Sequence, residues 1–599
     1  MESLKPQRSR SRESVNSDRN QDFKILDADL QTCKVFILYR KKNFCFQGAT
    51  KIKVLYGRVN ILGATITPEH CIGDKWFDVI SDPRKNMLLS LYNQSKTEEL
   101  EGLQLSLEGE SEEIKIDYVP ERASIIAIKE YKEYTESEQK NLLQADIQFN
   151  IPNMNRDFDE KKKGFFELNK SWKQGINNIV QNIRSQPDNQ NIKILVNGVV
   201  NVGKSTFATC LINEILSQTK SDVFILEVDP GQPNYTLAGQ LSLSKVENMI
   251  LTNNDFNDIQ ILKSYYLNSP QPNLNADYYN KSIELLDKEY QNYDTQGRQK
   301  ILIVNTCGWV EGIGAGIQFK ITDIIQPSHI VTVMRADVGL QGNEFSQKCR
   351  QQREGQINFI DVKSDKFKGA MNVKGAVQRN KKIKKALTHQ DEDRYIFVNK
   401  SQDGQDLPLV FNSKSMKHDD FSLSNEEFNK LKKQPFQIIQ FKDINLCFIT
   451  EQLDQVQNKI ETLRLFENQL VAGIQIDKAQ FKSLRSFEDV RVTEIRFTYR
   501  QLPPIEIKFY GLIRDIDFEG GIKLIPQNGI DLSKVEFNAL CLCHDSIFRF
   551  PSTYLIQDQS GHIQQNQQAR NEERKVFRGN NQDYRGGRGR GNYQNRYNQ

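Results

Sequence analysis

The chain lacks any hydrophobic run long enough to cross a membrane. Only 38% of its 599 residues are hydrophobic, and no stretch approaches the ~20 apolar residues that a spanning helix needs. The opening residues MESLKPQRSRSRESVNSDRN contain no apolar segment of the kind that secretory signals carry. We therefore expect a protein with no membrane partner and no secretory signal.

The chain also lacks cysteines spaced for metal binding. Its nine cysteines are scattered, and the nearest approach to a ligand pair, Cys541-Leu-Cys543-His544, has no second pair to complement it. An odd number of cysteines without a signal peptide predicts buried thiols in a reducing compartment.

Charge is almost balanced over the whole chain but not along it. The formal net charge is +4, whereas residues 570–599 alone hold eight Arg and Lys against three Asp and Glu, a net +5. We expect any general attraction to nucleic acid to be concentrated at the ends and in an internal basic run at 379–385.

What the chain does contain is a phosphate-binding loop. GVVNVGKST, from Gly198 to Thr206, fits the pattern G-x-x-x-x-G-K-[ST]. A buried strand is predicted before it at 192–197, and a helix after it at 207–216. Such a loop cradles phosphates with its backbone N–H groups, while its lysine reaches the β- and γ-phosphates and its serine binds Mg²⁺. A chance glycine turn is the alternative. The residues predicted to contact the nucleotide are Gly198, Asn201, Val202, Gly203, Lys204, Ser205 and Thr206.

Two further motifs follow predicted strands. In ILEVDPGQ, a strand at 223–228 ends at Asp229, and a Pro-Gly turn presents Gln232. A carboxylate at this end of a neighbouring strand can bind Mg²⁺ or accept a proton, although an Asp before Pro-Gly can also simply form the turn. In NTCGW, a strand at 301–305 leads to Thr306, Gly308 and Trp309. The indole can stack on a base or can pack on the sheet.

The pattern predicts an α/β protein with a P-loop domain built on a mainly parallel sheet, which includes a fourth strand at 330–334. A β-rich domain is expected before it and an α+β or β-rich domain after it. The predicted boundaries are a disordered tail at 1–24, a β-rich domain at 25–150, the P-loop domain at 151–345, a hydrophilic insertion with the basic run at 346–435, a C-terminal domain at 436–555 and a disordered tail at 556–599.

Together GVVNVGKST, DPGQ and TCGW resemble the eukaryotic polynucleotide 5′-hydroxyl kinases. The flanking stretches EVDPGQPNYTLAGQLSLSKV and FYGLIRDID look like the branch that processes pre-ribosomal RNA in the nucleolus. The resemblance covers roughly residues 35–66, 190–335 and 436–550.

The resemblance implies transfer of the γ-phosphate of ATP to an RNA 5′-hydroxyl, with Mg²⁺, in the nucleus and nucleolus and beside an endoribonuclease partner. It assigns Lys204, Asp229 and Gln232 to catalysis, Ser205 and Asp229 to the metal, and Thr306, Gly308 and Trp309 to the RNA end. For the family's arginine-bearing lid the sequence offers Arg335, Arg350 and Arg353, of which the last two can equally be surface residues.

Two basic segments, one near the C-terminal end and one internal, give weaker indications of RNA binding. The Arg/Gly tract at 584–593 is typical of RNA-binding segments but also of solubilising tails. The basic run at 379–385 can be a nuclear localisation signal, an RNA contact or a solvated charge run.

Two other functions remain open from the sequence. One is the sister branch, the kinase subunit of the pre-mRNA 3′-end cleavage and tRNA-splicing machinery, which shares all three motifs. The other is a non-catalytic ATP-binding scaffold, against which the intact Lys204, Ser205 and Asp229 argue.

Overall fold

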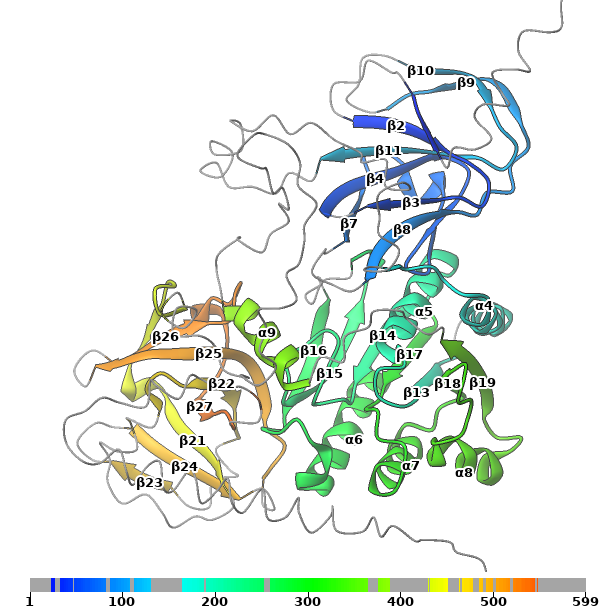
Figure 1. Ribbon diagram of the computed structural model, residues 1–599. Coiled ribbons are helices and arrows are strands. Elements are labelled where there is room, and N and C mark those ends of the chain that lie inside the picture. Colours follow the sequence, from blue (N-terminus) through cyan, green and yellow to red (C-terminus); the bar gives the residue numbers. More distant parts are fainter. Residues whose placement is uncertain are drawn as a thin grey trace, which may run out of the picture.

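The computed structural model describes the central part of the chain and leaves both ends outside (Figure 1). Both predicted tails, including the Arg/Gly tract, lie outside it apart from residues 23 and 24. The described residues are 23–26, 33–46, 48–81, 87–107, 113–130, 164–187, 190–252, 259–364, 375–387, 429, 431–450, 463, 466–477, 484–487, 492–498, 502–517, 521–544 and 547.

The N-terminal part consists of β-strands in two main sheets and a separate two-stranded ribbon. One sheet has the order β1-β2-β11-β4-β7, the other contains β12-β8-β5-β6 with β3 beside β8, and β9 pairs with β10. The elements are β1 (Phe23–Ile25), β2 (Cys33–Leu38), β3 (Asn43–Phe46), β4 (Gly48–Tyr56), β5 (Val59–Ile61), β6 (Ala64–Ile66), η2 (Pro68–Cys71), β7 (Phe77–Ser81), β8 (Met87–Asn93), β9 (Leu100–Leu105), β10 (Ile114–Val119), β11 (Ser124–Glu130) and β12 (Gly164–Phe165).

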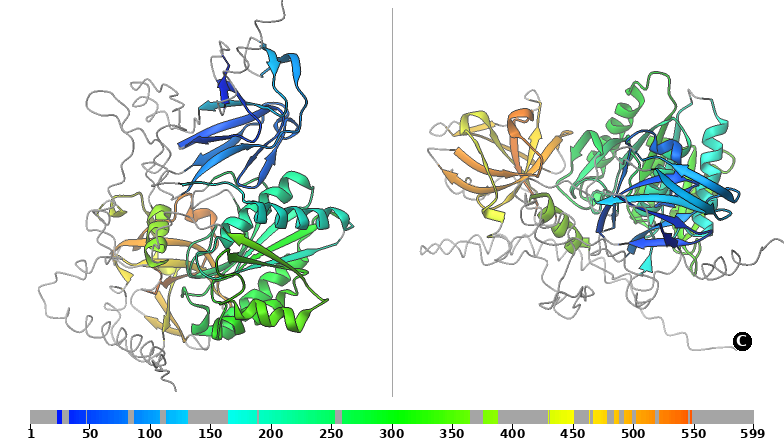
Figure 2. Two further views of the ribbon diagram at one scale, coloured as in Figure 1. Left: turned by 45° about the vertical axis from the view of Figure 1, so that its right-hand side comes forward. Right: turned by 90° about the horizontal axis from the view of Figure 1, so that it is seen from above.

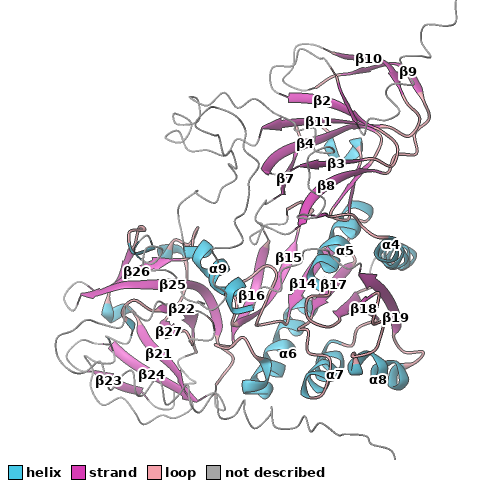
Figure 3. Cartoon of the chain, viewed as in Figure 1, coloured by secondary structure: helices cyan, strands magenta, loops and turns pink. Residues whose placement is uncertain are grey.

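The central part alternates strands and helices, as Figure 3 shows by colour. Its predicted strands are present within one residue of the expected bounds. The elements are α4 (Lys170–Ser185), β13 (Ile192–Asn197), α5 (Lys204–Gln218), β14 (Asp222–Glu227), β15 (Gln240–Val246), β16 (Gln260–Tyr266), η3 (Pro272–Asn275), α6 (Ala276–Asn292), β17 (Lys300–Asn305), α7 (Ile313–Ile325), β18 (His329–Arg335), α8 (Glu344–Arg353), β19 (Asn358–Ser364) and α9 (Gly375–Leu387).

The central sheet is mixed, with five parallel strands and two antiparallel strands at one side. Strands β19, β18, β13, β17 and β14 pair in parallel in that order, but β15 and β16 continue the sheet in antiparallel pairing. The reason is the connection, because parallel neighbours need a crossover, usually a helix, and the chain between β14 and β15 forms none. The expectation of a parallel sheet therefore applies to the five strands from β19 to β14 and not to β15 and β16, while the α/β class holds.

Two buried cores lie on opposite faces of the parallel strands. Side chains of α4, α5 and the N-terminal part share one core, whereas α6, α7 and α8 contribute to the other. Strand β13 illustrates the alternation, since Ile194 and Val196 enter the first core and Leu195 the second. Burial on both faces explains why these strands read as continuous apolar runs.

The C-terminal part is β-rich and extends the same sheet. Residue Tyr265 of β16 pairs with Glu506 of β25, and Lys263 forms a 2.6 Å ion pair with the same glutamate. The right-hand view of Figure 2 shows this part to one side of the central part. The elements are β20 (Gln437–Ile439), η5 (Phe441–Asp443), β21 (Asn445–Thr450), β22 (Leu470–Gln475), β23 (Leu484–Phe487), β24 (Val492–Thr498), β25 (Glu506–Asp517), β26 (Gly521–Pro526), η8 (Leu532–Lys534) and β27 (Ala539–Leu542).

The structure bears on the expectations about the cysteines and about membrane-spanning helices. Of the eight cysteines whose side chains are described, all are free thiols and only Cys543 is not fully buried, which confirms the prediction of buried thiols. Among the described residues, no helix combines the length and apolar character that crossing a bilayer requires.

The N-terminal part packs against α5, the helix that follows the phosphate loop. The Leu62–Gly63 turn has positive φ at both residues, and a Cβ on Gly63 would lie 2.5 Å from the Cys210 carbonyl oxygen. Buried Asn213 donates from Nδ2 to the carbonyls of Leu62 and Ile250, at 2.8 Å each, and accepts from the Ile250 N–H. One amide side chain thus joins three segments.

We predict that Asn213→Ala lowers the free energy of unfolding by about 2–4 kcal/mol, because it leaves buried backbone groups of Leu62 and Ile250 without partners. Thermal and urea denaturation of the full chain measure the change. The matched control is Asn177→Ala on the exposed face of α4. Equal stability of the two variants would contradict the prediction.

Candidate functional site

The phosphate loop has a backbone that only glycine allows at two positions. Gly198 and Gly203 have φ of 150° and 93°. A Cβ at Gly198 would collide with the Val333 carbonyl, and one at Gly203 would lie 3.1 Å from the Trp172 ring. Gly203 is also the residue that precedes the first turn of α5, so the loop ends at a helix N-terminus. Backbone N–H groups and the helix dipole both favour an anion there.

Lys204, the first residue of α5, is held against its own loop. Its Nζ donates to the Val199 carbonyl oxygen at 3.1 Å, and the side chain is buried. Burial lowers the pKa of Lys204, while the charges of Asp229 and Cys307 act in the opposite direction. The structure therefore brings the loop lysine together with groups from both neighbouring motifs.

Asp229 lies two residues beyond β14 and shapes the DPGQ loop. Its Oδ1 accepts hydrogen bonds from the backbone N–H groups of Gly231 and Gln232, at 3.0 and 3.1 Å. The side chain of Gln232 is exposed. Turn formation uses only one carboxylate oxygen, so the turn and a ligand contact through the other oxygen are compatible.

Helix α9 reaches this loop, which the sequence did not indicate. Lys382 donates from Nζ to the carbonyls of Pro233 and Asn234, at 2.8 and 2.9 Å. The basic run at 379–385 is thus part of a helix docked beside the DPGQ loop. The sequence indicated only that this run is basic. It could not indicate the contact with the DPGQ loop, because the contact joins segments about 150 residues apart.

Glu227, at the end of β14, is a buried acid that the motif search missed. Its Oε2 accepts from Asn305 Nδ2 at 2.9 Å, and the same Nδ2 lies 3.3 Å from Ser205 Oγ. Burial raises the pKa of Glu227 to about 7, against the opposing effects of Asn305, Lys382 and the backbone of Asn234. The available signal was an acid at the last position of an otherwise apolar strand.

Two oxygens of this cluster have no hydrogen-bond partner among the described residues. They are Glu227 Oε1 and Asn305 Oδ1, and both are buried. Acceptor oxygens without donors, next to the Ser205 hydroxyl, suit the water ligands of a hydrated divalent cation. The donor set therefore fits Mg²⁺.

The TCGW loop after β17 lies against the phosphate loop. Thr306 is buried and donates from Oγ1 to the Val196 carbonyl at 3.0 Å. Gly308 packs so closely on Val200 that any Cβ would collide with it. Trp309 is 37% exposed at the rim, above Gly314. Of the residues predicted to meet RNA, only the indole is thus clearly accessible.

The three lid arginines lie in different places. Arg335 ends β18, at the same edge of the sheet as the phosphate loop, and forms an exposed bidentate pair with Asp337, at 3.2 and 2.9 Å. Arg350 and Arg353 occupy the last turn of α8 and pair with Asp361 and Asp323. Because α8 runs back from the loop edge, these two point away from the nucleotide loop.

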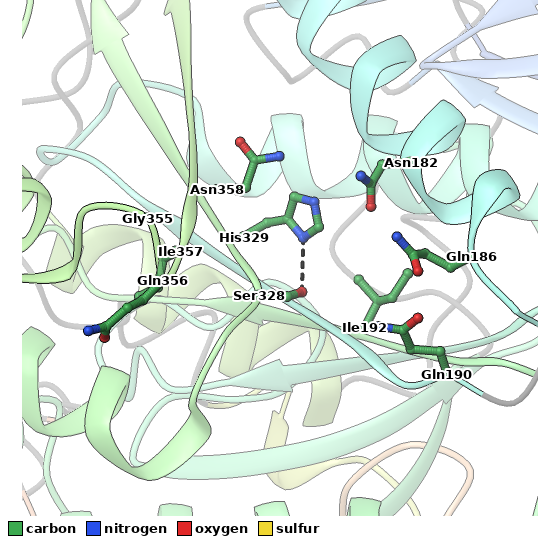
Figure 4. Close-up of a pocket in the computed structure, with 10 residues that line it drawn as sticks. All are labelled: Asn182, Gln186, Gln190, Ile192, Ser328, His329, Gly355, Gln356, Ile357 and Asn358. Atoms are coloured by element: carbon green, nitrogen blue, oxygen red, sulfur yellow. Dashed lines mark hydrogen bonds between the residues drawn. The ribbon is translucent and has the colours of Figure 1, made fainter.

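A separate cavity of about 350 Å³ opens at the opposite edge of the sheet, where β13, β18 and β19 begin. Figure 4 shows His329 in it, with its ring bonded to Ser328. None of the predicted site residues lines this cavity. Its lining is Asn182, Gln186, Gln190, Ile192, Ser328, His329, Gly355, Gln356, Ile357 and Asn358.

At the carboxyl edge, by contrast, three loops from neighbouring parallel strands meet. They bring a phosphate cradle with a buried lysine, two acids and an exposed indole into one place. Strand β17 lies between β13 and β14, so its loop borders both of the others. Such an arrangement can bind a nucleoside triphosphate and place a second reactant beside its phosphates.

We predict that Glu227→Gln stabilises the nucleotide-free protein more at pH 8 than at pH 5. The folded-state pKa of Glu227, about 7, is above its unfolded value. The protonated side chain therefore contributes fully to the stability of the folded protein below pH ~4.3, and this contribution is lost as the pH rises through 7 and the buried carboxyl ionises. The difference between the two pH values is expected to reach roughly 1–3 kcal/mol.

Melting temperatures with a chelator present measure this effect. The control is Glu289→Gln on the exposed face of α6. An increase in melting temperature that is the same at pH 5 and pH 8 would refute the assignment of a buried, titrating carboxyl.

Comparison with known proteins supports the resemblance in two separate regions. A family model for the P-loop of the mRNA cleavage and polyadenylation factor CLP1 matches residues 198–397. A model for the N-terminal domain of the polynucleotide 5′-hydroxyl-kinase NOL9 matches residues 24–163.

The curated relatives are also named polynucleotide 5′-hydroxyl-kinases. The Dictyostelium discoideum polynucleotide 5′-hydroxyl-kinase nol9 is 26% identical over 340 residues, which is 50% of this chain and 46% of the relative. The Candida albicans polynucleotide 5′-hydroxyl-kinase GRC3 is 30% identical over 206 residues, 32% of this chain and 29% of the relative. The chain spans between 27% and 46% of the lengths of the first four relatives.

Among solved structures, the wild-type Clp1p–Pcf11p (454–563) complex aligns over 86% of this chain and 98% of that chain. Its sequence identity is 12% and its TM-score is 0.47, a likeness too weak to carry an argument. The P-loop family model, however, covers all three motifs at the carboxyl edge of the sheet. In these regions the chain is similar to polynucleotide 5′-hydroxyl-kinases.

Proposed function

We propose that this chain is an ATP-dependent polynucleotide 5′-hydroxyl kinase that acts on RNA. The observation that carries the proposal is the convergence of the phosphate loop, Asp229 and the TCGW loop at one edge of the sheet. The names of the relatives support the same activity. Residues 151–345, extended by β19 of the same sheet, would form the kinase domain, with the β-rich regions on either side as further domains.

The phosphate loop holds the donor. Backbone N–H groups from Gly198 to Gly203 surround the phosphates, with Asn201 and Val202 in the loop and Thr206 in the first turn of α5. Lys204 leaves the Val199 carbonyl and moves to the β- and γ-phosphates. Ser205, and Asp229 through water, would hold Mg²⁺, which would supply charge neutralisation at the transferring phosphoryl group.

The TCGW loop holds the acceptor. Trp309 offers its exposed indole to a base near the RNA 5′ end. Gly308 lets this loop approach the phosphate loop, so that acceptor and donor come together. Thr306 fixes the loop on β13 through its bond to Val196, and in this role it positions the RNA end without an exposed hydroxyl.

The transfer itself is an in-line displacement. The RNA 5′-oxygen bonds to the γ-phosphorus as the bond to the β-phosphate oxygen breaks, and ADP leaves with the electron pair. The hydroxyl proton passes to the free oxygen of Asp229, while Gln232 orients the acceptor. Arg335, on leaving Asp337, and Lys382 would offset charge at the phosphates, because both lie near the loops at this edge of the sheet. Arg350 and Arg353 lie in the last turn of α8 and pair with Asp361 and Asp323.

The cellular role that fits best is pre-ribosomal RNA spacer processing in the nucleolus of the nucleus. A match to the N-terminal domain of NOL9, rather than to the P-loop model alone, favours this branch over the pre-mRNA cleavage and tRNA-splicing branch. An endoribonuclease that generates 5′-hydroxyl ends is the expected partner. The Arg/Gly tract at 584–593 would add RNA affinity.

We predict that the protein transfers labelled γ-phosphate to a 5′-hydroxyl RNA oligonucleotide and that Lys204→Ala reduces the rate at least about 100-fold, because charge stabilisation of the transferring group is lost. Lys220→Ala, an exposed lysine just beyond α5, should leave the rate unchanged. Nucleotide binding without any transfer by the unmodified chain would instead indicate a scaffold.

We predict that Trp309→Ala raises KM for RNA by roughly 5- to 150-fold, the equivalent of one stacked base. The affinity for ATP should not change, and Trp309→Phe should restore much of the loss. Tyr118→Ala serves as a control for loss of an exposed aromatic side chain elsewhere. A larger effect on ATP than on RNA would refute the acceptor role.

A further inference from the structure

The cluster of Glu227, Asn305 and Ser205 joins three elements at the base of the site. Asn305 ends β17, Glu227 ends β14, and Ser205 lies in the first turn of α5. The two strand residues are direct register partners, so their side chains project to the same face. The Asn305 Nδ2 group is the donor to both Glu227 Oε2, at 2.9 Å, and Ser205 Oγ, at 3.3 Å.

This arrangement uses both hydrogens of the Asn305 amide and leaves two acceptor oxygens without a partner. The two Nδ2 hydrogens are both engaged. The backbone N–H of Asn234 also acts on the Glu227 carboxylate, but the buried oxygens Glu227 Oε1 and Asn305 Oδ1 have no partner with hydrogen-bond geometry among the described residues. The charge of Lys382 acts on Glu227 from α9, but that carboxylate makes no ion pair within the described part of the chain. A buried acceptor without a donor is unfavourable, so an unassigned donor is expected here.

Asp229 is less suited than Glu227 to accept hydrogen bonds from the water ligands of a metal ion. One of its oxygens is occupied by the Gly231 and Gln232 N–H groups, and the residue lies two positions beyond the strand, where it is partly exposed. Glu227 by contrast is fully buried and is connected to the serine hydroxyl by a single amide.

We propose that Glu227 and Asn305 form an outer shell for the metal ion at Ser205, in which their unpartnered oxygens accept hydrogen bonds from water ligands. The inference rests on the proposed nucleotide site and deepens it. Glu227 and Asn305 are positioning residues, since they reach the metal through water and through the serine. Asp229 keeps its proposed contact with the metal and its place beside the acceptor.

The test measures metal affinity apart from catalysis. The full chain is titrated with Mg²⁺ in the presence of a fluorescent, non-hydrolysable ATP analogue, and the analogue's affinity is also measured with a chelator. Bound Mn²⁺ is followed by electron paramagnetic resonance as a second readout. The variants are Glu227→Gln and Asn305→Ala.

The matched control is Glu214→Gln, which changes another largely buried glutamate on α5, bonded to Thr65 at 2.8 Å on the N-terminal side. It removes a buried acid without touching the metal cluster. A melting curve for each variant separates loss of folding from loss of metal binding.

We expect Glu227→Gln and Asn305→Ala to raise the half-saturating Mg²⁺ concentration roughly 10- to 100-fold, the usual effect of losing a metal's outer-shell partner. Affinity for the analogue without metal should stay within about twofold of the unmodified chain, and Glu214→Gln should behave like the unmodified chain in both measurements.

Two results would overturn the proposal. One is an unshifted Mg²⁺ dependence in both variants. The other is an equal loss of analogue binding with and without metal, which would mark a purely structural cluster. Absence of any analogue binding by the unmodified chain would refute the proposed function itself, so the two failures can be told apart.

Discussion

The parallel pairing of β17 between β13 and β14 is the constraint on which the site depends. Parallel strands end at the same edge of a sheet, so three loops separated by up to about 100 residues meet there. The register matters as much as the order. A shift of β17 by one residue would turn Asn305 to the opposite face and break its bonds to Glu227 and Ser205.

The loops at this edge are supported from outside the sheet. The N-terminal part holds α5 through Asn213, and α9 holds the DPGQ loop through Lys382. The C-terminal part reaches the same loop, because Tyr510 donates to the Ala238 carbonyl at 2.7 Å. A phosphoryl-transfer site works by positioning, so rigid support from three distant segments serves its chemistry directly.

Much of the local structure was predictable, and the failures have common physical causes. The four central strands follow from continuous apolar runs, and the phosphate loop follows from its glycines. Arg350 and Arg353 follow the fourth strand as expected, but α8 carries them away from the loop edge. The mixed pairing of β15 and β16 was missed because an apolar run does not specify the direction of its neighbour.

The sequence by itself determined the elements whose conformation depends on near neighbours: the glycine loop, the strand before it, the helix after it and the Asp-Pro-Gly turn. Only the tertiary structure decided which polar groups became buried and bonded to one another. Glu227, Asn305 and Lys382 are ordinary residues in the sequence. They acquire a role because long-range strand pairing and the docking of α9 remove water from around them, and burial makes each unpaired donor or acceptor costly.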